Sequence, residues 1–336
     1  MFGNLITDFS VKRFMTSLKI SLPKKSFHRG TFSPDNYVLD EGLHAAVQVA
    51  LTLGQPLLLT GEPGTGKTLL AHRIAHDLAK EDASFLPKPL IFHTKTTSKA
   101  TDMLYTYDAL RHFHDANLRK AKGESAPETS DYIQLQALGK AIALTDAEAL
   151  ASGQFVQETA ARSSVVLIDE IDKAPRDFPN DILHEIEHYN FQIKEANNLL
   201  VQKGADQRIV VVLTSNSEKH LPEAFLRRCV FYHIPFPKKE ILTQIVQTQL
   251  GVQSNYSDGE LIDHFLMIRS LVKKKKPATA ELLAWLRILE INRFLDSNPN
   301  WNRLDADEKR ILRQSYAVIA KTQDDLKEIE KWLQGR

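Results

Sequence analysis

The sequence predicts an α/β fold, in which helices sandwich a parallel sheet, followed by an all-helical domain. Four short apolar runs carry this prediction, each bounded by helical or polar segments: residues 57–60, 90–93, 165–168 and 209–213. Strands of a sheet covered on both faces form continuous apolar runs, and their alternation with helices is typical of a parallel sheet. After the Pro-Phe-Pro run at 235–237 the strand signals stop.

Helical patterns account for most of the remaining chain. One precedes the first strand, at residues 42–52, and four follow the last, at residues 238–250, 258–272, 278–294 and 305–333. A chain of 336 residues has room for about two domains. We expect an α/β domain over residues 31–237 and a helical domain over 238–336. The α/β domain should carry an insertion at residues 95–150 or so, which includes the polar stretch 119–131.

The composition limits the class of protein. Hydrophobic residues make up 43% of the chain and charged residues 25%, as in globular proteins, and 43 basic against 42 acidic residues give a net charge of +1. Such balance does not favour wholesale binding to nucleic acid or to an anionic membrane. Cys229 is the only cysteine, which excludes an internal disulfide framework and fits a reducing compartment, so we expect the cytoplasm. No stretch of about 18 apolar residues predicts a membrane span.

Residues 1–30 form an amphipathic segment with apolar residues at helical spacing. Asp8, Lys12 and Arg13 interrupt the apolar run that a secretory signal would need. Two interpretations stay open: a helix docked on its own protein or a partner, and a helix lying in a membrane interface.

A glycine-rich loop between the first strand and the next helix follows the pattern G-x-x-x-x-G-K-T. We call this segment the phosphate loop; it consists of Gly61, Glu62, Pro63, Gly64, Thr65, Gly66, Lys67 and Thr68. The glycines let successive N–H groups point at a β-phosphate, and the helix N-terminus adds its positive end. Lys67 should reach the β and γ oxygens, and the Thr68 hydroxyl should ligate Mg²⁺. The loop predicts ATP and Mg²⁺ as ligands.

Phosphoryl transfer to water also needs an acid for the metal and a base for the water. Asp169 and Glu170 follow the apolar run 165–168 directly. Asp169 is placed to hold the Mg²⁺ shell, and Glu170 to polarise the attacking water. The alternative is a strand end with two solvated acids.

The order GEPGTGKT, LIDEIDKAP, LTSN and LPEAFLRRC resembles an AAA+ ATPase, and its details are similar to the MoxR branch. The resemblance covers residues 35–237 well. It implies that Asn216 is a polar sensor beside the γ-phosphate, and that Arg228 is an arginine finger reaching a neighbouring subunit of a ring, with a hexamer expected. Arg227 is the adjacent alternative, and an arginine pair that only caps a helix end is another. The backbone near Tyr37 and Val38 should lie beside the adenine.

The chain departs from the MoxR pattern in two places. The family carries a second sensor arginine after a proline of the helical lid domain, but Pro277 is followed by Ala278. Lys276 or Arg287 could substitute, or the contact is absent. The insertion, which faces the ring pore in the family, contains aromatic residues that suit either a client polypeptide or local packing: Tyr105, Tyr107, His112 and His114.

His184 to His188 match H-E-x-x-H, the helix signature of zinc proteases. Because the segment lies between Glu170 and Asn216, inside the expected ATPase core, we predict no zinc there.

The resemblance implies a ring ATPase that remodels or activates a protein partner, such as one with a von Willebrand factor A domain. A nucleic-acid translocase or restriction-type motor is the alternative, and the balanced charge counts against it. A second alternative is a nucleotide-gated switch that assembles a larger complex and hydrolyses ATP slowly.

Overall fold

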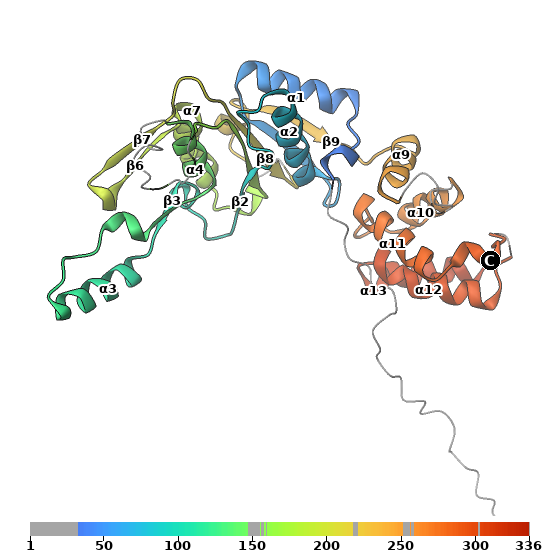
Figure 1. Cartoon of the computed structure of the whole chain (residues 1–336). Coiled ribbons are helices and arrows are strands. Elements are labelled where there is room, and N and C mark those ends of the chain that lie inside the picture. The colour runs from blue at the N-terminus through green and yellow to red at the C-terminus, as the bar shows by residue number, and fades with distance from the viewer. Residues whose placement is uncertain are drawn as a thin grey trace, which may run out of the picture. The chain divides into compact units, whose positions relative to one another are not determined.

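The computed structural model describes residues 33–146, 155, 158, 160–217, 221–250, 256, 259–301 and 303–335. The amphipathic segment 1–30 lies outside them. A parallel sheet of five strands in the order β2-β5-β8-β1-β9 forms the centre of the fold (Figure 1). Its strands are β1 Leu57–Gly61, β2 Leu90–His93, β5 Ser164–Asp169, β8 Ile209–Ser215 and β9 Val230–Ile234. The predicted α/β class is confirmed.

Side chains of the central strands alternate between two hydrophobic cores. Leu57, Leu59, Leu167 and Val212 point into a core shared with α1 (Glu41–Leu53) and α2 (Lys67–Glu81). Their neighbours, such as Leu58 and Ile168, point into a second core, which contains α4 (Ala137–Thr145), α6 (Phe178–Asp181) and α7 (Leu183–His188). Helices therefore cover both faces of the sheet, which explains why the central strands are uninterrupted apolar runs.

The edge strand β9 was not among the predicted strands. Only β1 pairs with it, and Phe231 and His233 are exposed. The run Val-Phe-Tyr-His-Ile is therefore partly polar, unlike the buried strands. Two small antiparallel pairs were also missed because each strand has only three or four residues. They are β3 Tyr105–Tyr107 with β4 Ile133–Leu135, and β6 Asn190–Ile193 with β7 Leu199–Gln202.

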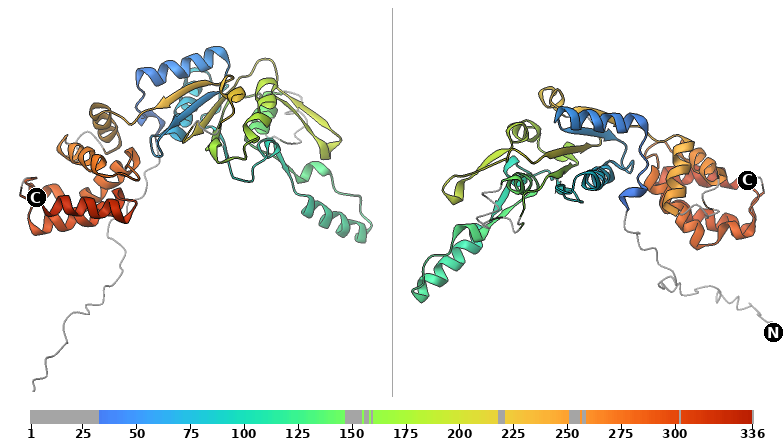
Figure 2. Two further views of the ribbon diagram at one scale, coloured as in Figure 1. Left: turned by 180° about the vertical axis from the view of Figure 1, so that it is seen from behind. Right: turned by 45° about the horizontal axis from the view of Figure 1, so that its top comes forward.

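Helix α3 (Ala109–Lys122) lies between β3 and β4 and stands away from the five-stranded sheet (Figures 1 and 2). None of its residues is buried. The first residues of the polar stretch 119–131, which was placed in the expected insertion, continue this helix as far as Lys122, and Gly123 caps its end with a φ of 73°.

The chain after β9 is helical in the part that the structure describes, as predicted. It contains α9 Lys239–Leu250, α10 Gly259–Leu271, α11 Thr279–Ile291, α12 Ala306–Ile319 and α13 Gln323–Gln334 around a core of its own, and we call this region the lid. The pattern at 305–333 is two helices rather than one. Thr322 caps the second by accepting a hydrogen bond from the Asp325 N–H, which starts a new helix after Ala320.

Parallel strands bring their carboxyl ends to one edge of the sheet. Gly61 at the end of β1, Asp169 at the end of β5 and Asn216 after β8 therefore lie near one another. No described helix has the length and apolarity that crossing a membrane requires.

Candidate functional site

The phosphate loop joins β1 to α2, the strand–loop–helix context that its motif requires. Gly64 and Gly66 have φ values of 81° and 92°, which side chains other than glycine rarely adopt. A Cβ on Gly61 would lie 2.7 Å from the Ile234 carbonyl oxygen, so the neighbouring strand also demands glycine there. The loop conformation is thus fixed by its glycines.

Lys67 is buried, at 8% exposure, and its amine lies across the loop. It donates hydrogen bonds to the carbonyl oxygens of Gly61 (2.7 Å) and Glu62 (3.0 Å), and to Asn216 Oδ1 (3.1 Å). Burial lowers the pKa of Lys67, while the surrounding carboxylates, among them Asp172 and Asp169, act to raise it. Three oxygen acceptors therefore hold the Lys67 amine beside the phosphate loop. The oxygens of a bound anion can take the place of these acceptors.

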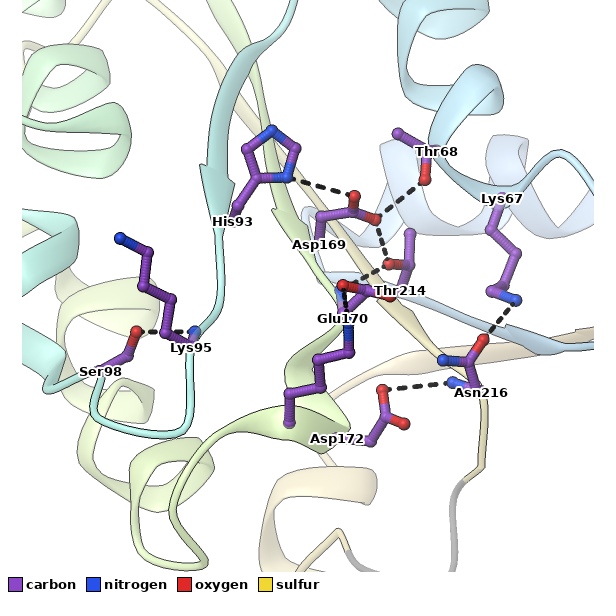
Figure 3. Close-up of polar contacts among 11 residues, drawn as sticks. Lys67, Thr68, His93, Lys95, Ser98, Asp169, Glu170, Asp172, Thr214 and Asn216 are labelled. Atoms are coloured by element: carbon purple, nitrogen blue, oxygen red, sulfur yellow. Dashed lines mark hydrogen bonds and ion pairs between the residues drawn. The ribbon is translucent and has the colours of Figure 1, made fainter. Parts of the chain in front are cut away.

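Asp169 receives two hydroxyl groups on one carboxylate oxygen (Figure 3). Thr68 Oγ1 donates to Asp169 Oδ1 at 2.9 Å and Thr214 Oγ1 donates to the same atom at 2.6 Å. The other oxygen, Oδ2, lies 3.4 Å from His93 Nδ1. The two residues predicted as metal ligands are thus in direct contact, and their oxygens are donors of the kind that Mg²⁺ prefers.

Glu170 has a left-handed backbone, with φ 58°, and its N–H donates to Thr214 Oγ1 at 2.9 Å. Its carboxylate accepts a hydrogen bond from Lys173 Nζ at 2.5 Å. This contact raises the pKa of Lys173. Both side chains are about half exposed, at 42% and 50%. Glu170 thus lies beside the site with its carboxylate paired to Lys173.

Asn216 bridges two parts of the site. Its side-chain oxygen accepts from Lys67, and its backbone N–H donates to Asp172 Oδ1 at 3.3 Å. Figure 3 shows Asn216 facing Lys67 across the edge of the sheet.

The two arginines after α8 (Glu223–Leu226) have different partners. Arg227 pairs with Glu223 on its own helix, and both side chains are 76% exposed. Arg228 pairs with Glu187 of α7 and also donates to the Ala224 carbonyl oxygen at 3.0 Å. Contacts from two helices therefore hold the Arg228 guanidinium.

Tyr37 reaches the phosphate loop from the short helix η1 (Pro34–Asn36). Its ring lies 3.2 Å from the position of a Cβ on Gly66, and burial raises its pKa. Arg73 on α2 fixes η1 by donating to the Pro34 and Asp35 carbonyl oxygens at 3.0 and 3.1 Å. Val38 follows and is partly buried.

The lid contacts the phosphate loop at two points. Ala278 and Ala280, at the start of α11, have Cβ atoms 3.3 Å from the position of a Cβ on Gly64. Arg269 on α10 pairs with Glu62 at 2.6 Å. No sequence pattern marked Arg269, because it lies in a helix of ordinary composition.

Lys276 and Arg287 were named as residues that could substitute for the second sensor. Arg287 donates to the Gln249 carbonyl oxygen at 2.8 Å, and Lys276 is exposed.

The H-E-x-x-H segment forms the six-residue helix α7, in which the rings of His184 and His188 stack at 4.5 Å. Glu187 is engaged by Arg228. Among the residues with described positions, no group of three or more His, Cys, Asp or Glu is arranged to hold a metal ion.

Two solved structures are similar to the chain at low identity. One is the FIGL-1 AAA domain in complex with ADP, at 16% identity and a TM-score of 0.42, with 89% of each chain covered. Another is the HORMA:CdnC:Trip13 complex of E. coli MS115-1, at 14% identity and a TM-score of 0.39, covering 84% of this chain and 80% of that chain. No curated protein matches the chain.

The sequence also matches the family described as "ATPase family associated with various cellular activities (AAA)" over residues 57–237. This match runs from the first strand of the sheet to the linker before α9 and covers more than half of the 336 residues. The chain therefore belongs to the AAA family of ATPases.

Proposed function

We propose that this protein binds ATP with Mg²⁺ at the phosphate loop and hydrolyses it to ADP and phosphate. One observation carries the proposal: three segments of the chain bring two polar clusters to the same edge of the sheet, Lys67 bonded to Asn216, and Asp169 bonded to Thr68 and Thr214. In this assignment Lys67 exchanges its carbonyl and amide partners for phosphate oxygens. Asn216, which already contacts Lys67, positions the attacking water against the γ-phosphate.

The residues present fit a magnesium ion. Thr68 Oγ1 and Asp169 Oδ1 are 2.9 Å apart, and both are oxygen donors. These two residues would hold the ion, which when bound neutralises charge on the phosphate oxygens. Magnesium usually keeps several waters, so two protein ligands suffice.

Glu170 is the base in this proposal. Its carboxylate must exchange Lys173 for a water molecule in line with the γ-phosphate. The pair is half exposed and therefore weak, so this exchange is easily made.

We further propose that the chain works as a ring, with a hexamer expected, in which Arg228 completes the site of a neighbouring subunit. The contact with Glu187 favours Arg228 over Arg227, because a fixed guanidinium loses less freedom when it meets a phosphate. Arg227 is anchored only within its own helix.

The proposed partner is a protein, as in the MoxR-like branch, and one with a von Willebrand factor A domain is the first to test. Support comes from α3, where Leu110 and Phe113 are 81% and 70% exposed. Large apolar side chains left this exposed are typical of interaction sites. Basic side chains near the two ends of α3 favour an acidic client segment: Arg111, Arg119, Lys120 and Lys122. We propose a cytoplasmic location.

The test is phosphate release from ATP with Mg²⁺, followed by capture of partners on a trapped form. Lys67→Ala should bind no nucleotide. Glu170→Gln should bind ATP but hydrolyse it at least ~10²-fold more slowly. Binding by the Lys67→Ala variant that equals the parent's would reject the nucleotide site. Captured DNA instead of protein on the Glu170→Gln form would favour the motor, and slow turnover by the parent would favour a switch.

A further inference from the structure

Glu62 places a negative charge within the phosphate loop. Its carbonyl oxygen accepts a hydrogen bond from Lys67 Nζ at 3.0 Å. Its carboxylate is one of the charges that act on the pKa of Lys67, in the direction that raises it. Because the Glu62 carboxylate interacts electrostatically with the Lys67 amine, it also repels a polyphosphate bound to that amine.

Arg269 neutralises this carboxylate from the lid, with Nη2 donating to Glu62 Oε2 at 2.6 Å. The guanidinium is fixed by its lid surroundings: Nη1 donates to the Pro277 carbonyl oxygen, and the group lies 3.7 Å over the ring of Phe236. Its side chain is 11% exposed, against 45% for Glu62. The cation therefore belongs to the lid and the anion to the phosphate loop.

The lid lies directly on the loop at a second point. Gly64 faces Ala278 and Ala280, whose Cβ atoms are 3.3 Å from the position of a Cβ on Gly64. Their small side chains allow the start of α11 to approach the loop backbone. The contact that brings α11 to the loop and the contact that neutralises Glu62 are both made by the lid, so lid movement would break them together.

We propose that Arg269 and Glu62 couple the position of the lid to the affinity of the phosphate loop for nucleoside di- and triphosphates. With the lid on the loop, Arg269 neutralises the Glu62 carboxylate, and the phosphate loop has its highest affinity for the nucleotide. When the lid moves away, the Glu62 carboxylate stands uncompensated beside the phosphates and promotes their release. This inference rests on the proposed nucleotide site.

The test is a double-mutant cycle on ADP affinity and on the ADP release rate, followed with a fluorescent ADP analogue. Arg269→Gln keeps an amide that can stack on Phe236 and donate to Pro277, but loses the charge. It should weaken ADP binding about tenfold and speed release, because Glu62 is left unpaired. Glu62→Gln leaves the guanidinium unopposed, so it should strengthen binding and slow release. The double variant should return close to the parent.

Lys239→Ala is the matched control, because it removes a lid ion pair of the same length, Lys239 with Asp263 at 2.6 Å, that does not involve the phosphate loop. Its ADP affinity should equal the parent's. Tryptophan fluorescence checks that the lid of each variant is folded, since all three tryptophans lie there.

Equal weakening in Arg269→Gln and the double variant would show that Arg269 acts through packing alone, and would overturn the inference. So would a Glu62→Gln affinity no higher than the parent's. If the parent binds no ADP, or Lys67→Ala binds it equally well, the proposed nucleotide site fails instead.

Discussion

Thr68 Oγ1 donates a hydrogen bond of 2.9 Å to Asp169 Oδ1, and so connects the first turn of α2 to the carboxyl end of β5. A bound cation would lie against both oxygens and take the place of this bond. Asp169→Asn keeps an acceptor for the Thr68 and Thr214 hydroxyls but removes the charge that a divalent cation needs.

We therefore expect Asp169→Asn to fold normally and to lose most of the gain in ATP affinity that Mg²⁺ provides, about tenfold or more. The measurement is ATP affinity with and without Mg²⁺. Asp172→Asn is the control, because it removes a carboxylate charge near the same site, and Asp172, which accepts a 3.3 Å bond from the Asn216 N–H, is not a proposed ligand. A magnesium effect in Asp169→Asn as large as in the control would remove Asp169 from the metal site.

Lys173 holds the carboxylate of Glu170 at 2.5 Å, in a pair that is half exposed on both sides. Replacing Lys173 with Ala frees Glu170 for water, so basal ATP turnover should rise, by about two- to five-fold because exposed ion pairs are weak. Steady-state phosphate release at saturating ATP measures this. Lys173→Arg, which keeps the charge, should stay near the parent rate. A fall in turnover in Lys173→Ala would mean that Lys173 assists the reaction.

The central strands could be predicted from the sequence because burial on both faces gives each of them a continuous apolar run. Val165 to Ile168 are 0% exposed, and all four positions of this run are apolar. The edge strand β9 is not buried on both faces, since Phe231 is 49% exposed and His233 is exposed to solvent. A strand that is half covered and paired on one side carries no continuous apolar signal.

The local parts of the site could also be predicted, because each is a short segment with its own chemistry. Lys67 and Thr68 belong to one loop, and Asp169 and Glu170 end one strand. The contact between Glu62 and Arg269 joins residues 207 positions apart. Neither residue is unusual in its own segment, so only the packing of the lid against the loop reveals the pair. The same holds for Lys173, whose role depends on the turn after β5.

We expect Asp325 to make the lid sensitive to acid. It is 3% exposed and accepts hydrogen bonds from Thr322 Oγ1 at 2.6 Å and from the N–H groups of Lys273 and Lys274. Burial alone would raise the pKa of Asp325, but these hydrogen bonds outweigh it and the pKa is lowered. A carboxyl with a lowered folded-state pKa contributes stability above its unfolded pKa and loses it as the pH falls through the folded value.

We therefore expect the urea midpoint of the lid, followed by tryptophan fluorescence, to fall as the pH drops below about 4. Asp325→Asn should lower the free energy of unfolding at pH 7 by about 1–3 kcal/mol and flatten this pH dependence. Asp324→Asn is the neighbouring control, since Asp324 pairs only with the exposed Lys274 side chain, and it should change little. A pH profile of Asp325→Asn that still falls like the parent's would contradict the assignment.

Helix α3 contacts its surroundings through His112 and leaves Leu110 and Phe113 exposed. His112 stacks on Tyr132 at 4.4 Å and bonds Tyr107 at 2.7 Å, whereas Phe113 next to it is 70% exposed. Tyr107 and His112 thus take part in local packing, and so does Tyr105, which donates to Glu195 at 2.9 Å.

Leu110→Ser with Phe113→Ser should therefore change stability by no more than about 0.5 kcal/mol and leave basal turnover intact. The same variant should lose the rise in ATP turnover that a partner protein produces. His112→Ala is the contrasting change, because it removes the packing at the base of α3 and should expose that helix to proteolysis. Full stimulation of the double serine variant by a partner would place the contact elsewhere on the protein.

The oligomeric state distinguishes a ring enzyme from a solitary switch. Arg228 is held by Glu187 and by the Ala224 carbonyl oxygen, with its side chain 47% exposed. A guanidinium supplied by a neighbouring subunit can raise the rate ~10³-fold or more by neutralising charge in the transition state. Turnover per subunit should then rise with protein concentration, and ATP should favour the oligomer, since bound nucleotide bridges two chains.

Mixing two inactive variants tests this directly. Lys67→Ala should bind no ATP but can still supply Arg228 to the site of a neighbouring subunit. Arg228→Ala should bind ATP but cannot supply this arginine to its neighbour. Together they should recover part of the activity that each lacks alone. Arg227→Ala is the matched control, because its partner Glu223 lies on its own helix, and it should remain active. A monomer whose turnover does not depend on concentration, with Arg228→Ala as active as the parent, would leave Arg228 as a charge at the end of α8. Loss of activity in Arg227→Ala alone would instead make Arg227 the finger.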